Sequence, residues 1–280
     1  MFSLIVQLYL NNYSMSKNKT NLKKIALITG GCGLLGWEYA KSLNEINYKV
    51  IILDNNLFKI KQRKHSLNKL NLDIDIYAVD ITNEKNLIKK IKEIINKHKK
   101  IDVLINNAAI DFKPIQKNIK IKNNFLDFDQ KRWEREISVG LTGAFLCSKV
   151  IGKYMVKEKY GIILNIASDL SIIAPNQNLY KHLKTSKPVS YSVIKHGIHG
   201  LTKYLAALWA QFNIRVNTLS PSGVLTNQDK IFIKKIKKLI PMKRMAKVNE
   251  YNESIKYLCS DKSSYLTGQN VIIDGGRTII

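Results

Sequence analysis

The sequence predicts an α/β fold in which a doubly wound parallel sheet of about seven strands is flanked by helices in a single domain. Short runs of β-branched residues alternate with longer segments of helical periodicity along the whole chain. The short runs are almost continuously apolar, as expected of strands that are buried on both faces of a parallel sheet. With 280 residues, the chain is also long enough to bury one sizeable core.

Each expected strand is a short apolar run, and most are followed by an amphipathic segment. The expected strands are Lys24–Thr29, Lys49–Leu53, Ile74–Val79, Ile101–Ile105, Gly161–Ile166, Ile214–Leu219 and Asn270–Ile273. The expected helices lie near residues 34–46, 56–71, 83–98, 128–156, 190–211 and 249–260. The polar stretch 174–190 interrupts this rhythm, and we expect it to be an inserted loop.

Charge and cysteine usage limit the classes of partner. The formal net charge of +25 could indicate a nucleic acid or an anionic membrane. However, the lysines are spread along the chain without a nucleic-acid-binding motif, so we expect neither partner and interpret the excess as a lysine-rich surface that can attract an anionic substrate. The three cysteines, Cys32, Cys147 and Cys259, form no CxxC pair, which indicates no disulfide framework, no metal site and a reducing cytoplasm.

The first residues read as an extension rather than as part of the fold. The apolar run Met1–Leu10 is too short to span a bilayer and lacks the basic start of a signal peptide. We therefore expect residues 1–22 to be a disordered extension, with Met1 or Met15 as the start, and residues 23–280 to form the domain. No later run has the length and apolarity of a membrane helix.

A glycine-rich turn follows the first expected strand. The sequence Thr29-Gly-Gly-Cys-Gly-Leu-Leu-Gly36 leads directly into a helix. Glycines allow a tight turn there, and they allow a pyrophosphate to approach the backbone N–H groups at the helix N-terminus. Glycine clusters alone are weak evidence, but this one has a strand before it, a helix after it and Asp54 at the end of the next strand. These features together predict a Rossmann-type dinucleotide site.

Asp54 predicts NAD as the cofactor, because a carboxylate can accept hydrogen bonds from the adenosine ribose and repels the 2′-phosphate of NADP. No arginine follows it directly. The competing interpretation is that Asp54 only caps the next helix. Asp80-Ile81 and Asn107-Ala108 come at the ends of the third and fourth expected strands, whose carboxyl ends should line the same crevice.

Tyr191 and Lys195 lie at positions i and i+4 and therefore on one face of a helix. A nearby ammonium stabilises phenolate and lowers the pKa of a tyrosine from about 10, which makes the pair a plausible acid/base device for alcohol and ketone interconversion. Ser168, at the end of the fifth expected strand, could hold the substrate oxygen. Each residue also has an ordinary structural explanation, in an amphipathic helix or a turn.

These motifs, in this order and spacing, resemble the short-chain dehydrogenase/reductase family from about Lys23 to Thr278, including RVNTLSPSGVLT and YLTGQNVIIDGG near the C-terminus. Within the family the chain resembles the single-domain branch, and most of all the oxidoreductases of flagellin and surface-glycan modification clusters. The resemblance implies Ser168, Tyr191 and Lys195 as the catalytic set and a homodimer or homotetramer. The residues that it implies as cofactor contacts are Gly30, Gly33, Leu35, Gly36, Asp54, Asp80, Ile81, Asn107, Ala108, Tyr191, Lys195, Pro221, Val224 and Thr226.

Three positions depart from the family's usual pattern. The glycine spacing is TGxxGxxG, which is more common in the extended branch, and Ser222 replaces a usual glycine. Gly140 stands where the family usually has an asparagine that helps to hold a water in the proton relay. The last departure implies a shorter or differently routed relay.

The sequence therefore predicts a cytoplasmic, NAD-dependent oxidoreductase of a secondary alcohol or ketone, with an anionic sugar derivative as the first choice of substrate. A 3-oxoacyl thioester reductase remains an alternative, although its usual preference for NADPH disagrees with Asp54. A non-catalytic, cofactor-binding regulator is an alternative of another class.

The inserted loop 174–190 separates Ser168 from Tyr191, so we expect it to lie over or beside the crevice. It carries Tyr180, Lys181, Lys184 and Lys187. These residues are candidates for a substrate lid that binds a phosphate or carboxylate. The alternative is a solvated surface loop that shares the lysine excess of the chain.

Overall fold

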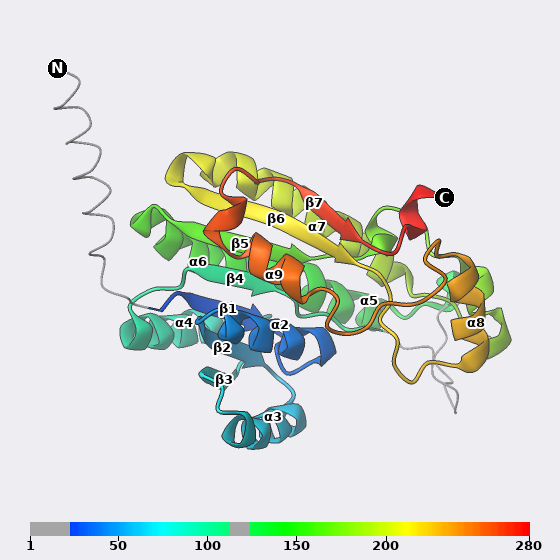
Figure 1. Ribbon diagram of the computed structural model, residues 1–280, viewed down its shortest axis with the longest axis horizontal. Helices are drawn as coiled ribbons and strands as arrows, with labels where there is room; N and C mark the ends of the chain where they lie inside the picture. The colour runs from blue at the N-terminus through cyan, green and yellow to red at the C-terminus, as the bar shows by residue number, and fades with distance from the viewer. Residues whose placement is uncertain (1–22, 112–123) are drawn as a thin grey trace.

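The computed structural model describes residues 23–111 and 124–280, so the expected extension of residues 1–22 lies outside the described residues. The seven strands form one parallel sheet in the order β3-β2-β1-β4-β5-β6-β7 (Figure 1). Their bounds are β1 Ile25–Thr29, β2 Lys49–Asp54, β3 Ile74–Ala78, β4 Val103–Asn106, β5 Gly161–Ile166, β6 Ile214–Pro221 and β7 Asn270–Ile273. This arrangement confirms the predicted doubly wound sheet.

Helices cover both faces of the sheet, as the apolar strands require. Buried side chains of α2, α3 and α9 pack on one face, and those of α4, α6 and α7 pack on the other. The helices, numbered from α2 as in Figure 1, are α2 Leu34–Glu45, α3 Leu57–Leu70, α4 Glu84–His98, α5 Gln130–Ile137, α6 Gly143–Glu158, α7 Val189–Trp209, α8 Lys230–Lys238 and α9 Asn252–Leu258.

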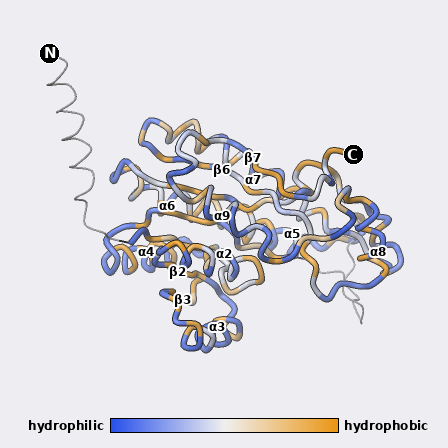
Figure 2. Tube along the Cα trace, in the orientation of Figure 1, coloured by the Kyte–Doolittle hydropathy of each residue, from blue (hydrophilic) through white to orange (hydrophobic). Residues whose placement is uncertain are grey.

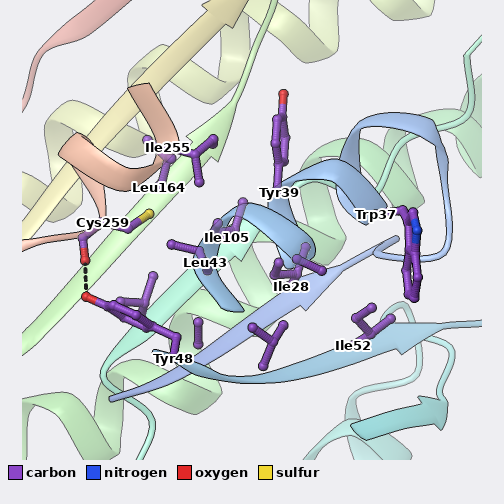
Figure 3. Packing of buried hydrophobic residues seen from close by; sticks show 14 of the residues in the cluster. Ile28, Trp37, Tyr39, Leu43, Tyr48, Ile52, Ile105, Leu164, Ile255 and Cys259 are labelled. Atoms are coloured by element: carbon purple, nitrogen blue, oxygen red, sulfur yellow. Dashed lines mark hydrogen bonds between the residues drawn. The ribbon is translucent and has the colours of Figure 1, made fainter. Parts of the chain in front are cut away.

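The core on the α2 side joins distant parts of the chain. Tyr39 and Leu43 of α2 are fully buried, and Ile255 of α9 belongs to the same cluster (Figure 3). The Tyr48 hydroxyl is also buried, and it donates a 2.7 Å hydrogen bond to the carbonyl of Cys259. Hydrophilic segments lie on the outside of the fold, as along the outer turns of α3 (Figure 2).

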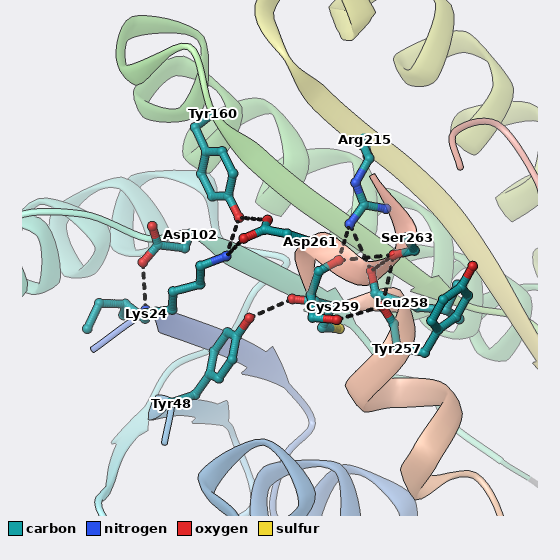
Figure 4. Close-up of polar contacts among 12 residues, drawn as sticks. Lys24, Tyr48, Asp102, Tyr160, Arg215, Tyr257, Leu258, Cys259, Asp261 and Ser263 are labelled. Atoms are coloured by element: carbon teal, nitrogen blue, oxygen red, sulfur yellow. Dashed lines mark hydrogen bonds and ion pairs between the residues drawn. The ribbon is translucent and has the colours of Figure 1, made fainter. Parts of the chain in front are cut away.

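Polar contacts close the edge of the sheet at which the strands begin (Figure 4). The Lys24 ammonium donates to the Tyr160 hydroxyl at 2.8 Å and pairs with Asp261 at 2.6 Å. Arg215, at the start of β6, donates to the carbonyls of Leu258 and Ser260 at 3.3 and 2.9 Å. Structural contacts therefore hold this edge of the sheet together.

One helix prediction is wrong in detail, and one helix of the structure was not expected. The expected helix 128–156 is two α-helices, α5 and α6, joined by a π-helical turn at Ser138–Thr142. By length and composition, the stretch from α5 to α6 could also cross a membrane, but α6 packs against the sheet as a core helix does. Helix α8 is missing from the expected helices although its sequence is amphipathic, with Phe232 and Ile236 four residues apart and both buried.

The π-helical turn brings Gly140 against α7. A Cβ atom on Gly140 would lie 2.8 Å from Cγ2 of Ile194, a side chain that is 3% exposed. Cγ2 is attached to the branched Cβ of Ile194, so it cannot move away without a change of rotamer. An asparagine at this position, as in the family's usual pattern, therefore does not fit without a change of the Ile194 rotamer or a displacement of α7.

We expect Gly140→Ala to lower the free energy of unfolding by about 1–3 kcal/mol, the usual cost of overpacking a core. Gly200→Ala is a matched control, because Gly200 is exposed on α7 and a Cβ atom there would have no other atom within 4 Å. That change should instead stabilise the protein by up to about 1 kcal/mol through helix propensity. Urea denaturation of both variants measures the two effects, and equal effects would contradict the packing argument.

Candidate active site

A cavity of about 690 Å³ opens at the carboxyl ends of the strands. Ligands bind at this edge in doubly wound folds, because the loops after the strands converge there. Every residue that the sequence predicted as a cofactor contact lines the cavity, and so do Ser168, Tyr180 and Lys187. Lys181 and Lys184 do not line it.

The glycine-rich turn forms the floor of one half of the cavity. Gly30 has a φ of +61°, and a Cβ atom there would lie 2.8 Å from the Cα of Ala108. A Cβ on Gly36 would lie 2.6 Å from the carbonyl oxygen of Gly30. The Asn107 amide holds the turn by donating to the carbonyls of Thr29 and Gly30, both at 3.1 Å. Only glycine leaves this cradle open, which fits a pyrophosphate above the N-terminus of α2.

The Asp54 carboxylate lines the same half of the cavity as the glycine-rich turn. It accepts hydrogen bonds from the backbone N–H groups of Cys32 and Asn56, both at 3.0 Å. Cations from α3 also approach this half: Lys59 lines the cavity, and Arg63 Nε donates to the Cys32 carbonyl at 3.3 Å. Lys59 and Arg63 come five and nine residues after Asp54, so the residues directly after Asp54 did not reveal these cations.

Two segments bring the predicted catalytic residues together. Ser168 follows β5, whereas Tyr191 and Lys195 lie one turn apart near the start of α7. The Lys195 ammonium is buried and donates a 2.7 Å hydrogen bond to the carbonyl of Ile166, at the end of β5. Burial lowers the pKa of Lys195 to about 8, so this group loses its charge more easily than an exposed lysine.

A second lysine is closer to Tyr191 than Lys195 is. The Lys187 Nζ lies 3.6 Å from the centroid of the Tyr191 ring, against 5.7 Å for Lys195. Burial raises the pKa of Tyr191 to about 12, and the Lys187 charge acts in the opposite direction. Burial alone would lower the pKa of Lys187, but its 2.8 Å ion pair with Asp111 contributes to a net increase. Lys187 is therefore held as a cation beside the phenol.

The buried carboxylate of Asp169 binds Ser168 and two further residues, and no sequence motif indicated it. Asp169 accepts hydrogen bonds from the hydroxyls of Ser168 and Ser222, both at 2.8 Å. It also pairs with Arg277 at 2.7 Å, and both charged side chains are at most 5% exposed. Ser222, which departs from the family's usual glycine, thus serves this carboxylate. Arg277 comes shortly after the last strand. Because residues that follow parallel strands line the binding crevice, this position could have identified it as a site residue.

The inserted loop is only partly what the sequence indicated. It forms two short 3₁₀ turns, at Gln177–Leu179 and Lys181–Leu183. Tyr180 between them is 5% exposed and packs on Phe232 of α8 with a ring-centroid distance of 5.4 Å. Tyr180 and Lys187 line the cavity, whereas Lys184 and Lys181 lie outside it at the surface of the loop. The expectation that Lys181 and Lys184 contact the substrate is therefore not supported by their placement.

Comparisons with known proteins agree with this architecture. A family model described as enoyl-(acyl carrier protein) reductase matches residues 33–278. An NAD-dependent glycerol dehydrogenase from Listeria innocua is 33% identical over 91% of this chain and 94% of its own length. A 3-oxoacyl-[acyl-carrier-protein] reductase from Buchnera aphidicola is also 33% identical, over 91% of this chain and 97% of its own.

A post-translational flagellin modification protein A from Campylobacter coli is 30% identical over 90% of this chain and 97% of its own. Among solved structures, a short-chain dehydrogenase from Leptospira borgpetersenii with bound NAD⁺ is 31% identical, with a TM-score of 0.78 over 91% of this chain and 93% of its own. A gluconate 5-dehydrogenase from Burkholderia cenocepacia, in complex with NADP and tartrate, is 25% identical, with a TM-score of 0.79 over 92% and 96%. With its sheet, glycine turn and Ser/Tyr/Lys set, the chain belongs to the short-chain dehydrogenase/reductase family of oxidoreductases.

Proposed function

We propose that this protein is an NAD-preferring oxidoreductase that interconverts a secondary alcohol and a ketone on a polyhydroxylated, anionic sugar derivative in the cytoplasm. One observation carries the proposal: Ser168, Tyr191 and Lys195 line the same cavity as the glycine-rich turn and Asp54. This juxtaposition supports a substrate oxygen beside Tyr191 and a dinucleotide along the rest of the cavity.

The residues of the chain have separable roles in this proposal. When bound, the dinucleotide supplies the hydride-transfer chemistry. In the direction of oxidation, Tyr191 accepts the proton of the alcohol, and Ser168 holds the substrate oxygen. Because burial raises the pKa of Tyr191 to about 12, the phenolate needs cations nearby, and Lys187 and Lys195 provide them. Gly140 offers no side chain to a relay, so in this proposal the proton leaves Tyr191 by a shorter or differently routed relay than the family's usual one.

The relatives support a sugar or polyol as the substrate class. Those that match include proteins named as a glycerol dehydrogenase and a flagellin modification protein, and the structural neighbours include a gluconate 5-dehydrogenase. The runner-up is 3-oxoacyl thioester reduction, which the Buchnera relative's name favours. Lys59 and Arg63 near Asp54 would suit the NADP that such a reductase uses, so cofactor choice discriminates between the two functions.

Exposed apolar side chains on two neighbouring helices support the expected homo-oligomer. Phe145 of α6 is 47% exposed, and Tyr204 and Leu208 of α7 are 67% and 43% exposed. Large apolar groups that gather on one surface favour a protein interface. We propose that α6 and α7 form the contact between subunits.

Tyr191→Phe keeps the ring but removes the ionisable hydroxyl. We expect kcat to fall by at least about a hundredfold, the scale of acid/base assistance. The affinity for NAD should stay nearly unchanged. The assay follows NADH absorbance with a panel of polyols, sugar acids and sugar phosphates, and calorimetry measures NAD binding. A variant that turns over at the normal rate would exclude Tyr191 as the proton-transfer residue.

Asp54→Ala tests the choice of cofactor. We expect the ratio of kcat/KM for NAD over NADP to fall by about tenfold or more, because one like-charge repulsion with the 2′-phosphate is lost. The double variant Asp54→Ala, Lys59→Gln should gain less activity with NADP than Asp54→Ala alone, because it also lacks the Lys59 cation that could bind the 2′-phosphate. If the wild-type protein already prefers NADP, the NAD assignment is wrong and the thioester reductase becomes the better interpretation.

Lys187→Met keeps the length of the side chain but removes its charge, and its partner Asp111 is half exposed and can be solvated. Losing this cation should raise the pKa of Tyr191, which shifts the pH–rate profile of oxidation to higher pH. At pH 7 we expect kcat to fall by about threefold to thirtyfold, the scale of a desolvated cation–π pair. The control is Lys181→Met with Lys184→Met, which should change neither kcat nor KM. A rise in KM for an anionic substrate in that control would restore the lid interpretation of these two lysines.

A further inference from the structure

We propose that Arg277 is the residue that binds an oxyanion of the substrate, through the edge of its guanidinium formed by Nε and Nη2. The ligand chemistry is a carboxylate or phosphate that presents two oxygens to this edge. This inference rests on the proposed function and specifies where the charge of its substrate is bound.

The guanidinium of Arg277 is buried but incompletely hydrogen-bonded. The side chain is 5% exposed, and Nη1 donates to Asp169 at 2.7 Å. Nε is fully buried and has no hydrogen-bond partner among the described residues. Unsatisfied donors of a buried cation are costly, so a site of this kind is completed when an acceptor enters it.

The sheet order places Arg277 on the substrate side of the cavity. The glycine turn and Asp54 follow β1 and β2, whereas Arg277 follows β7, on the other side of β5 and Ser168. A dinucleotide pyrophosphate on the glycine turn therefore lies away from Arg277, although both regions line one cavity. The pyrophosphate, the anionic part of the cofactor, is therefore too far away to occupy the free edge of the guanidinium, and an oxyanion of the substrate can take that place.

Asp169 determines how the guanidinium is presented. One oxygen of its carboxylate binds Arg277 and the other accepts the hydroxyl of Ser168 at 2.8 Å. Only the Asp169 carboxylate thus separates Arg277 from Ser168, which would hold the reacting oxygen of the substrate. The substrate's oxyanion must lie within a few bonds of the carbon that reacts, which favours a compact sugar acid or sugar phosphate over a nucleotide-linked sugar or a carrier thioester.

Arg277 suits this task better than Lys187, another buried cation of the cavity. Lys187 is a point charge that already lies over the Tyr191 ring and pairs with Asp111. An arginine is always charged, and its planar edge makes two parallel hydrogen bonds to a carboxylate or phosphate. Lysine at position 277 could keep the pair with Asp169 but could not offer that edge. Arg277→Lys therefore separates oxyanion binding from the stability of the buried ion pair.

The test is calorimetric titration of the NAD-saturated protein, since NAD blocks the glycine turn against anions. The probes are tartrate, inorganic phosphate, and threitol, the neutral polyol with the carbon skeleton of tartrate. We expect the wild type to bind an oxyanion, and Arg277→Lys to weaken that binding by about tenfold to a hundredfold, whereas threitol binding should not change. Arg244→Lys is the matched control, because Arg244 is 42% exposed and pairs with Glu250.

Each outcome decides the proposal. A loss confined to the Arg277 variant supports it, and the stronger of the tartrate and phosphate titrations names the type of oxyanion. Equal binding by Arg277→Lys and wild type, or no oxyanion binding by the wild type, overturns it. If the variant does not fold, the Arg277 Nε–H proton resonance of the wild type is followed instead: a downfield shift with tartrate or phosphate but not with threitol supports the proposal, and no shift overturns it. Because these readouts measure binding, a protein that turns over no alcohol would refute the proposed function without deciding this inference.

Discussion

The parallel register of the seven strands is the constraint on which the rest of the molecule depends. Because every strand points the same way, all strands begin at one edge of the sheet and end at the other. At the first edge, Lys24, Tyr160 and Asp261 form a polar network that ties β1 and β5 to the segment after α9. At the second edge, the backbone turns away from the sheet after each strand, and the residues that follow converge on one cavity.

Within that cavity, the buried carboxylate of Asp169 connects the ends of three strands. A buried charge is tolerated only where partners replace its hydration. Asp169 obtains them from Ser168 after β5, Ser222 after β6 and Arg277 after β7. The same contacts orient the Ser168 hydroxyl, so the electrostatic requirement of one carboxylate also positions a group beside the reacting oxygen. This dependence explains why a serine occupies position 222, where glycine is more usual in the family.

The surroundings of Tyr191 show a balance of opposing effects. Desolvation favours the neutral phenol and raises its pKa, whereas the nearby cations Lys187 and Lys195 favour the phenolate. Lys195 is itself buried, which lowers its pKa to about 8 and weakens its role as a permanent charge. Lys187 does not have this weakness, because Asp111 keeps it protonated. The inserted loop thus contributes Lys187 as a second cation beside Tyr191, whereas the sequence motif indicated only Lys195.

The sequence by itself determined the parallel sheet, the glycine-rich turn, Asp54 and the Ser168, Tyr191 and Lys195 set, because each of these depends on periodicity or on spacing over a few residues. Only the tertiary structure decided which loop lysine reaches the cavity, because the loop is held by long-range packing such as that of Tyr180 against Phe232 of α8. It also decided the pairing of Asp169 with Arg277, which are 108 residues apart. No local pattern encodes such a pair: it arises because parallel strands bring their ends to one edge, where a buried carboxylate must find a cation.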